Sequence, residues 1–301
     1  MDNIILKLSM NKDFNKGLLL TSLGSFWWGF IGVIYFQYVS HIGHIELVVH
    51  RCLWTAIMLI LTTTFFSKWK KFIKIASKFK NLFYLFISGF LIFINWAIWI
   101  YAVATERIID ASFGYFIMPI ISVLLGYIFF KEKLNNKRIF SIILVFISIF
   151  ILIFYNFKSL PWVGLVVALS WAFYNLVRKK INVDTDVGLL IESLFIFPFA
   201  IVAFYLIAKN GLNDFSLSNP GFSLFLILAG PMTVIPLFLY VRGVELIGLG
   251  PTGMIFYITP TLQFFLGYFY YNEIFSMVKF VSFIIIWIAV IIYLKDLYEK
   301  N

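Results

Sequence analysis

Long apolar stretches recur along the whole chain, and only short polar segments separate them. A hydrocarbon core about 30 Å thick needs roughly 20 helical residues to cross it. Windows of that length predict ten membrane-spanning helices, near residues 17–38, 46–66, 82–104, 108–130, 139–157, 160–177, 187–208, 221–241, 251–271 and 278–294. The expected fold class is therefore all-α and integral to the membrane, because a helix satisfies its own backbone groups in lipid.

The sequence also repeats itself. Tyr101 to Glu106 (YAVATE) matches Tyr240 to Glu245 (YVRGVE) at an offset of 139 residues, and Gly114 and Gly253 keep that offset. After a shift of two residues, the matching positions are Pro119, Gly126, Tyr127 and Glu132 with Pro260, Gly267, Tyr268 and Glu273. Such a long period indicates a duplicated unit of five helices.

The duplication divides the chain into two halves of one membrane domain, residues 1–157 and 158–301. Because five is odd, the second half enters the membrane from the opposite side, so the repeats are inverted. Inverted repeats around a central cavity are typical of carriers with a site near the middle of the bilayer. A duplicated membrane protein that binds or regulates without net transport fits the same pattern.

Basic residues are unevenly shared between alternate loops of a chain with 62% hydrophobic residues, 13% charged residues and a net charge of +10. One side has Lys7, Lys12, Lys16, Lys68, Lys70, Lys71, Lys74, Lys78, Lys80, Lys131, Lys133, Lys137, Arg138, Arg178, Lys179, Lys180, Arg242, Lys295 and Lys300. The other has only Arg107, Lys158, Lys209 and Lys279. This asymmetry predicts a multi-pass protein of the inner (cell) membrane with both termini cytoplasmic, and it explains the charge without nucleic acid as a partner. Residues 67–81 fit a basic amphipathic segment on the inner surface.

Ionisable side chains inside predicted spans are candidate contacts for a solute, because they are costly in lipid. Arg51 lies in the second span beside Glu46 and His50, and Glu192 lies at a similar depth in the seventh span. Inversion places Arg51 toward the outer face and Glu192 toward the inner face. Arg51 suits a substrate carboxylate and Glu192 an amine, although snorkelling or local pairing explains Arg51 equally well. His50 also fits a hydrogen-bonding helix residue.

Uncharged polar residues extend the set of cavity candidates. Asn95, Tyr115, Tyr257 and Gln263 could hydrogen-bond a solute in an aromatic cavity, and they could also bridge helices. Pro119 and Pro260, which lie at repeat-related positions, each remove a backbone hydrogen bond and are candidate hinges.

Several kinds of chemistry have no motif in the sequence. We find no Walker-type phosphate loop, no cluster of metal ligands and no nucleophile with a base at motif spacing. The expectation is a protein that is not an enzyme and needs no metal or cofactor. Cys52 is the single cysteine and fits a packing role. The expected partners are a small-molecule solute and the lipid bilayer, and the sequence is compatible with a monomer and with a homodimer.

Five motifs resemble the RarD-like branch of the EamA-type transporters in the drug/metabolite transporter superfamily. They are Trp28-Gly29, His50–Trp54 (HRCLW), Tyr115–Pro119 (YFIMP), Gly230–Pro236 (GPMTVIP) and Tyr257–Phe264 (YITPTLQF). The resemblance implies ten helices in two inverted five-helix repeats around a central cavity, and transport of amphipathic metabolites or drugs. It brings no agreed catalytic residues, so Arg51, Tyr257 and Gln263 are motif positions only. Met118 departs from the small polar residue that often precedes this proline, which predicts a more apolar cavity.

The function expected from residues and resemblance is secondary transport of a small organic solute across the inner membrane by alternating access. The alternative is a membrane-embedded binding or regulatory protein. The identity of the solute, the direction of transport and any coupling to protons or ions are not encoded in these motifs.

Overall fold

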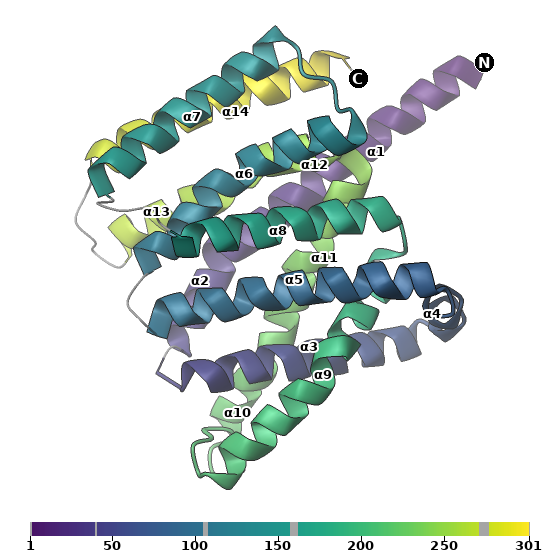
Figure 1. Cartoon of the computed structure of the whole chain (residues 1–301), viewed down its shortest axis with the longest axis vertical. Helices are drawn as coiled ribbons and strands as arrows, with labels where there is room; N and C mark the ends of the chain where they lie inside the picture. The colour runs from purple at the N-terminus through teal and green to yellow at the C-terminus, as the bar shows by residue number, and fades with distance from the viewer. Residues whose placement is uncertain (1, 40, 105–107, 157–161, 271–276, 301) are drawn as a thin grey trace.

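The computed structural model describes residues 2–39, 41–104, 108–156, 162–270 and 277–300. Every regular element within these ranges is helical, as Figure 1 shows. The elements are α1 (Asp2–Phe26), η1 (Trp27–Ile31, a π-helical turn), α2 (Gly32–Tyr38), α3 (His44–Phe65), α4 (Trp69–Ala76), α5 (Phe79–Ala104), α6 (Ile108–Phe130), α7 (Asn136–Asn156), α8 (Trp162–Ile181), α9 (Thr185–Lys209), α10 (Pro220–Ile227), α11 (Ala229–Ile247), α12 (Leu249–Ile255), α13 (Ile258–Phe269) and α14 (Met277–Lys300).

Within the described residues, helices lie in each of the ten windows that the hydropathy pattern predicts. Among the described residues, seven helical segments are long and apolar enough to cross a membrane, and these are 12–38, 44–65, 79–99, 136–155, 185–209, 220–247 and 277–299. The described apolar part of α6 is shorter, from Gly114 to Phe130. The last turn of α8 is basic, and a turn divides α12 from α13.

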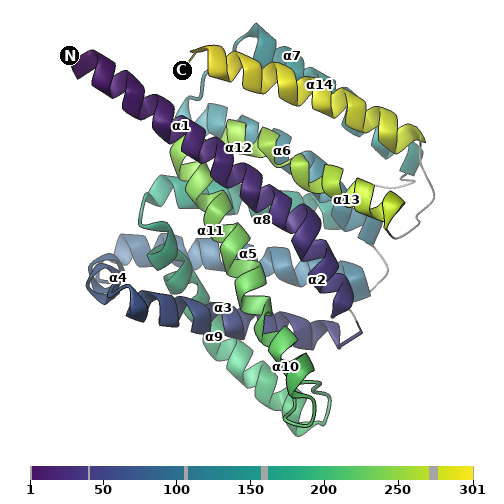
Figure 2. The same ribbon diagram turned by 180° about the vertical axis from the view of Figure 1, so that it is seen from behind.

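The helices pack in two layers. One layer contains α7, α6, α8, α5 and α9 and is nearer the viewer in Figure 1. The other layer contains α14, α12 with α13, α1 with α2, α11 and α3 and is nearer the viewer in Figure 2. The main packing partners are α7 with α14, α6 with α8 and α12, α5 with α8 and α9, α3 with α9 and α11, and α1 with α11. The start of α1, the end of α14 and the short helix α4 lie at the same end of the bundle in both views. We call this the terminal end.

Two helix crossings depend on glycine. A Cβ on Gly89 of α5 would lie 3.1 Å from the carbonyl oxygen of Glu192 in α9, and one on Gly230 of α11 would lie 2.6 Å from that of Trp54 in α3. Small residues allow such backbones to approach closely in a membrane protein, where packing rather than hydrophobic burial holds helices together. These crossings set which side chains of α3 and α9 face the centre.

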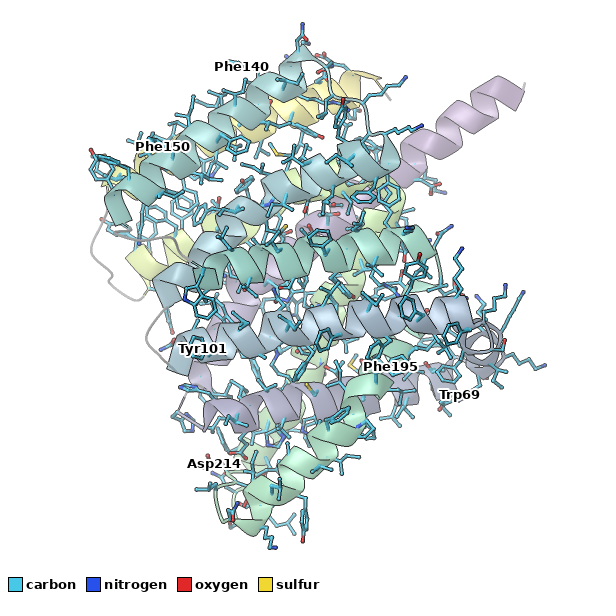
Figure 3. The ribbon with its side chains drawn as sticks, viewed as in Figure 1. Trp69, Tyr101, Phe140, Phe150, Phe195 and Asp214 are labelled. Carbon is cyan, nitrogen blue, oxygen red and sulfur yellow. The ribbon has the colours of Figure 1, made fainter. Side chains whose placement is uncertain are left out.

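Large apolar side chains cover the outside of the bundle. Phe140 and Phe150 of α7 project outward in Figure 3, and their exposed fractions are 51% and 68%. An aqueous surface does not favour so many exposed aromatic and aliphatic groups, whereas lipid accepts them. Helix α4 differs, because it combines apolar residues with Lys70, Lys71 and Lys74 and has no buried residue. Helix α4 fits the basic amphipathic segment expected from residues 67–81.

Candidate functional site

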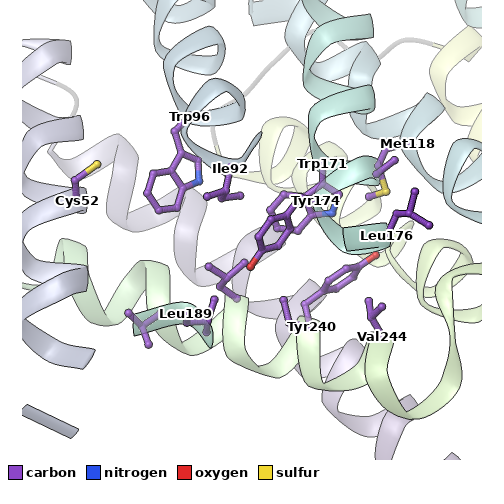
Figure 4. Close-up of a cluster of buried hydrophobic side chains, with 14 of the residues drawn as sticks. Cys52, Ile92, Trp96, Met118, Trp171, Tyr174, Leu176, Leu189, Tyr240 and Val244 are labelled. Atoms are coloured by element: carbon purple, nitrogen blue, oxygen red, sulfur yellow. The ribbon is translucent and has the colours of Figure 1, made fainter. Parts of the chain in front are cut away.

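Aromatic side chains fill the middle of the molecule between the two layers. Trp28 of η1 and Trp171 of α8 meet edge to face with ring centroids 5.1 Å apart. Tyr240 of α11 lies 5.7 Å from Trp171 and 5.5 Å from Phe256, which is in the turn after α12. Figure 4 shows Trp171 and Tyr240 within the surrounding apolar cluster. The centre is therefore formed by η1, α8, α11 and the turn after α12, and it is mostly aromatic.

Arg51 of α3 lies beside this centre and is only partly buried. Its guanidinium carbon is 4.8 Å from the ring centroid of Phe36 in α2 and 4.8 Å from that of Trp96 in α5. Its Nε donates a hydrogen bond of 3.3 Å to the hydroxyl of Thr233 in α11. Arg51 is thus held by three helices, and cation–π contact compensates part of the cost of keeping its charge in apolar surroundings.

Arg51 differs from the other described arginines in its charge partners. The other described arginines have carboxylate partners: Arg138 lies 2.9 Å from Asp296, Arg178 3.4 Å from Glu192, and Arg242 2.7 Å from Glu245. Arg51 has no ion pair with any residue that the structure describes. Of the two explanations offered by the sequence, local pairing with an acid therefore does not apply within the described ranges.

Glu192 of α9 lies in a fully buried polar cluster. It accepts hydrogen bonds from Ser88 (2.5 Å) and Tyr174 (3.2 Å), and it forms an ion pair with Arg178. Arg51 and Glu192 each lie seven residues after the first residue of their helix, His44 and Thr185. Because α3 and α9 run in opposite directions in Figure 1, the two side chains lie toward opposite ends of the bundle.

Both ring nitrogens of His50 are engaged. Nδ1 accepts a 3.1 Å hydrogen bond from the indole of Trp54, so Nε2 carries the proton and donates to Glu46 at 3.3 Å. The same oxygen of Glu46 accepts from the backbone N–H groups of Asp214 and Phe215, at 2.8 and 3.2 Å. His50 therefore helps to fasten the loop after α9 to α3, which is the hydrogen-bonding role that the sequence also allowed.

Two uncharged candidates bridge helices. Asn95 of α5 donates to the carbonyl of Val167 at 2.9 Å and to Ser170 at 3.1 Å, both in α8. The hydroxyl of Tyr257 donates to the carbonyl of Phe116 in α6 at 2.7 Å. The carbonyl of Phe116 lies one turn before Pro119, where the proline ring disturbs the backbone hydrogen bonds of the helix. Tyr257 therefore supports a weakened turn of α6.

Tyr115 and Gln263 are partly buried, and their side chains make no hydrogen bond to the described residues. The ring of Tyr115 lies 5.7 Å from Trp99 and 5.9 Å from Phe256, and Tyr115 is within electrostatic range of Arg51. The structure therefore brings Tyr115 and Arg51 to the same part of the centre.

The two prolines differ in their local structure. Helix α6 continues through Pro119, whereas Pro260 lies in the first turn of α13 after the break at Phe256 and Tyr257. Since Pro260 has no N–H, the carbonyl of Phe256 accepts instead from Thr259 at 2.9 Å.

Sequence reasoning missed the buried ion-pair cluster around Arg178. The predicted sixth span ends at residue 177 and treats Arg178 as a loop residue, but α8 continues to Ile181 and buries this guanidinium. Nη2 of Arg178 donates to the carbonyl of Thr185 at 3.1 Å and lies 3.9 Å from Glu245. The signal available was the presence of two acids, Glu192 and Glu245, in otherwise apolar helices.

Two cavities define space between and beside the helices. A narrow cavity of about 10 Å³, enough for roughly one water molecule, lies between α3, α5, α9 and α11 and is lined in part by Trp96 and Glu192. A groove of about 1120 Å³ lies outside the centre, where α6 and α7 meet the end of α14. The described residues contain no group of His, Cys, Asp and Glu that could hold a metal ion.

Comparison with known proteins gives consistent likenesses. Residues 15–154 match the EamA-like transporter family. Protein RarD of Salmonella typhi is 32% identical over 285 residues, which cover 95% of this chain and 96% of that protein. The uncharacterized transporter YojE of Bacillus subtilis is 31% identical over 93% of this chain and 94% of its own length. A crystal structure with 12% identity aligns with a TM-score of 0.70 over 93% of this chain and 97% of that one, which is a likeness of fold.

Proposed function

Since this chain belongs to the EamA-like transporter family, as a RarD-like member of the drug/metabolite transporter superfamily, we propose that it carries a small organic solute across the cell membrane by alternating access. It is a multi-pass membrane protein of a transporter family. The proposal adds ten spans in two inverted repeats, residues 1–157 and 158–301, with the terminal end in the cytoplasm and a solute site between the halves.

The observation that carries the proposal is a symmetry in the helix contacts. When each helix is replaced by its counterpart in the other half, one contacting pair of helices becomes another contacting pair. The counterparts are α1 and α8, α3 and α9, and α5 and α11. Packing of α1 on α11 therefore corresponds to packing of α8 on α5, and packing of α3 on α11 corresponds to packing of α9 on α5. Helices α7 and α14, α3 and α9, and α6 and α12 pack against their own counterparts. This pattern supports an internal two-fold axis between the layers, with a shared centre that each half can approach from one side.

Three ion pairs between the halves lie at the terminal end. Lys68 pairs with Asp186, Lys71 with Asp184 at 3.0 Å, and Lys179 with Glu132 at 3.1 Å. We propose that these contacts close the path at this end and separate when the site opens there, because rocking one half against the other must part them. The basic residues of this end favour a cytoplasmic location.

Within the proposed path, the candidate residues have different roles. Arg51, Tyr115 and Gln263 keep polar atoms that no described residue bonds, and we assign them to the solute. His50, Asn95, Tyr257 and Glu192 already bond protein groups, so we assign them to the walls that hold the site. Pro119 and Pro260 are the proposed hinges, at repeat-related places where backbone bonding is weakened.

Reconstitution into liposomes tests the proposal. Purified protein is incorporated with phenylalanine, phenylacetate, tyramine, uridine or chloramphenicol inside, and uptake of the same labelled compound is followed with protein-free liposomes as control. A carrier accumulates label by counterflow for at least one compound, and the signal saturates. Binding of a compound without counterflow of any would favour the alternative, a membrane-embedded binding or regulatory protein.

Crosslinking supplies the second arm of this experiment. Cysteines in place of Lys71 and Asp184 should form a bond that stops counterflow, and reduction should restore it. A crosslinked protein that carries solute at the unmodified rate would contradict the assignment of these contacts to the closed end.

A further inference from the structure

The geometry points to an organic monoanion as the solute, with its carboxylate paired to Arg51 and its apolar body against the neighbouring aromatic rings. This inference rests on the proposed transport function and names its substrate class.

The guanidinium is fixed but not saturated. Phe36 and Trp96 hold it from two different helices, and Thr233 takes its Nε. The terminal nitrogens make no hydrogen bond to the described residues, and the side chain is only partly buried. A guanidinium donates in its own plane, so this free edge presents two parallel N–H groups, the arrangement that binds a carboxylate through both oxygens.

Charge balance selects one negative charge. Among the described residues, the nearest acid along α3 is Glu46, whose Oε1 accepts from His50 and two backbone N–H groups and whose carboxylate makes no ion pair with Arg51. No acid of the described residues therefore compensates the positive charge of Arg51 in these apolar surroundings, where an unpaired charge is costly. A monoanion neutralises it, a cation is repelled, and a dianion leaves a surplus negative charge.

The walls specify the rest of the solute. Trp96 and Tyr115 present aromatic surface near Arg51, and Trp99 lies 5.7 Å from Tyr115. The hydroxyl of Tyr115 makes no hydrogen bond to a described residue. An apolar or aromatic body gains burial there. Glu192, the acid at the equivalent position of the other half, is occupied by Arg178, Ser88 and Tyr174, so an ammonium group gains nothing from it. The site therefore favours simple organic acids over amines and zwitterions.

Binding to the purified full-length protein tests this. Acetate, benzoate, phenylacetate and indole-3-acetate are compared with their amides, and phenylacetate also with phenethylammonium, by calorimetry and thermal shift at matched chloride. We expect at least one aromatic acid to bind and to raise the melting temperature, with its amide and the amine about 10–100-fold weaker, as expected when a charge-assisted hydrogen-bonded pair is lost.

Variants locate the binding. Arg51→Gln should weaken binding of the acid about 10–100-fold. The affinity of Arg51→Lys should lie between those of Arg51→Gln and the wild type, because the charge remains but the two parallel N–H groups are lost. Arg242→Gln should bind the acid as the wild type does. If Arg51→Gln fails to fold, Arg51→Lys and the acid-to-amide contrast of the wild type decide. An amide that binds as well as its acid, an Arg51 variant with undiminished acid binding, or no acid bound at all would overturn the inference. If a neutral or cationic compound shows counterflow in those cases, the proposed transport function is retained and only the substrate class is wrong. If no compound shows counterflow, the transport function and the substrate class are both refuted.

Discussion

The ion pair between Arg178 and Glu192 allows a stability prediction with a defined magnitude. The side chains are 0% and 3% exposed, and Arg178→Met leaves the carboxylate of Glu192 buried with only two neutral hydrogen-bond donors, Ser88 and Tyr174. Breaking a buried pair by removing one partner costs about 3–5 kcal/mol, because the remaining charge is uncompensated. Glu245, the other acid near Arg178, keeps Arg242 at 2.7 Å and is not orphaned.

The matched control is Arg242→Met, which removes the same charge from a side chain that is 42% exposed. Its partner Glu245 is 6% exposed but keeps the Thr185 hydroxyl at 2.8 Å and Arg178 at 3.9 Å, so this variant should lose less stability than Arg178→Met. The double variant Arg178→Met with Glu192→Leu removes both buried charges. It should be more stable than Arg178→Met alone by at least about 1 kcal/mol, since replacing a buried pair by apolar groups is often close to neutral.

The assay is equilibrium unfolding in mixed micelles of increasing dodecyl sulfate content, followed by circular dichroism and tryptophan fluorescence. The free energies of unfolding of the wild type and the three variants form the comparison. If Arg178→Met and Arg242→Met are equally stable, the burial argument is refuted. If the double variant is less stable than Arg178→Met, Glu192 does not depend on Arg178 for its burial.

Two further predictions concern the terminal end. Gly248 has φ +93°, and a Cβ there would collide with the Glu132 carboxylate, whereas Gly211 has φ +67° and no atom within 4 Å of an added Cβ. Gly248→Ala should therefore lower the melting temperature more than Gly211→Ala. Equal shifts in melting temperature would mean that backbone strain alone decides. The hydrogen bond that Lys71 donates to the Asp184 carboxylate raises the pKa of Lys71, so the pairing persists at neutral pH and is lost as pH rises through that raised pKa. Asp184→Asn should lower the pKa of Lys71 and speed its acylation at about pH 9, which mass spectrometry of the labelled peptide measures; an unchanged rate would show that the pair is not formed.

Hydropathy alone located the helices of this protein. Apolar stretches of membrane-crossing length must be helical because lipid offers no partners for backbone groups, so helix positions follow from composition along the chain. The family resemblance, drawn from five short motifs, is confirmed by relatives that match over nearly the full length. Helix ends were less predictable. The extension of α8 through Arg178 depends on Glu192 and Glu245, which no local pattern connects to it.

The state of each buried polar group was decided only by the tertiary structure. The sequence predicts similar surroundings for Arg51 and Glu192, since each is an ionisable residue seven positions after the start of an apolar helix. In the folded chain, the crossing of α9 with α5 and α8 surrounds Glu192 with Arg178, Ser88 and Tyr174, while the crossing of α3 with α5 and α11 gives Arg51 two aromatic rings and one hydroxyl. Compensation of a charge depends on contacts between residues far apart in the chain, and hydropathy carries no information about which helices cross.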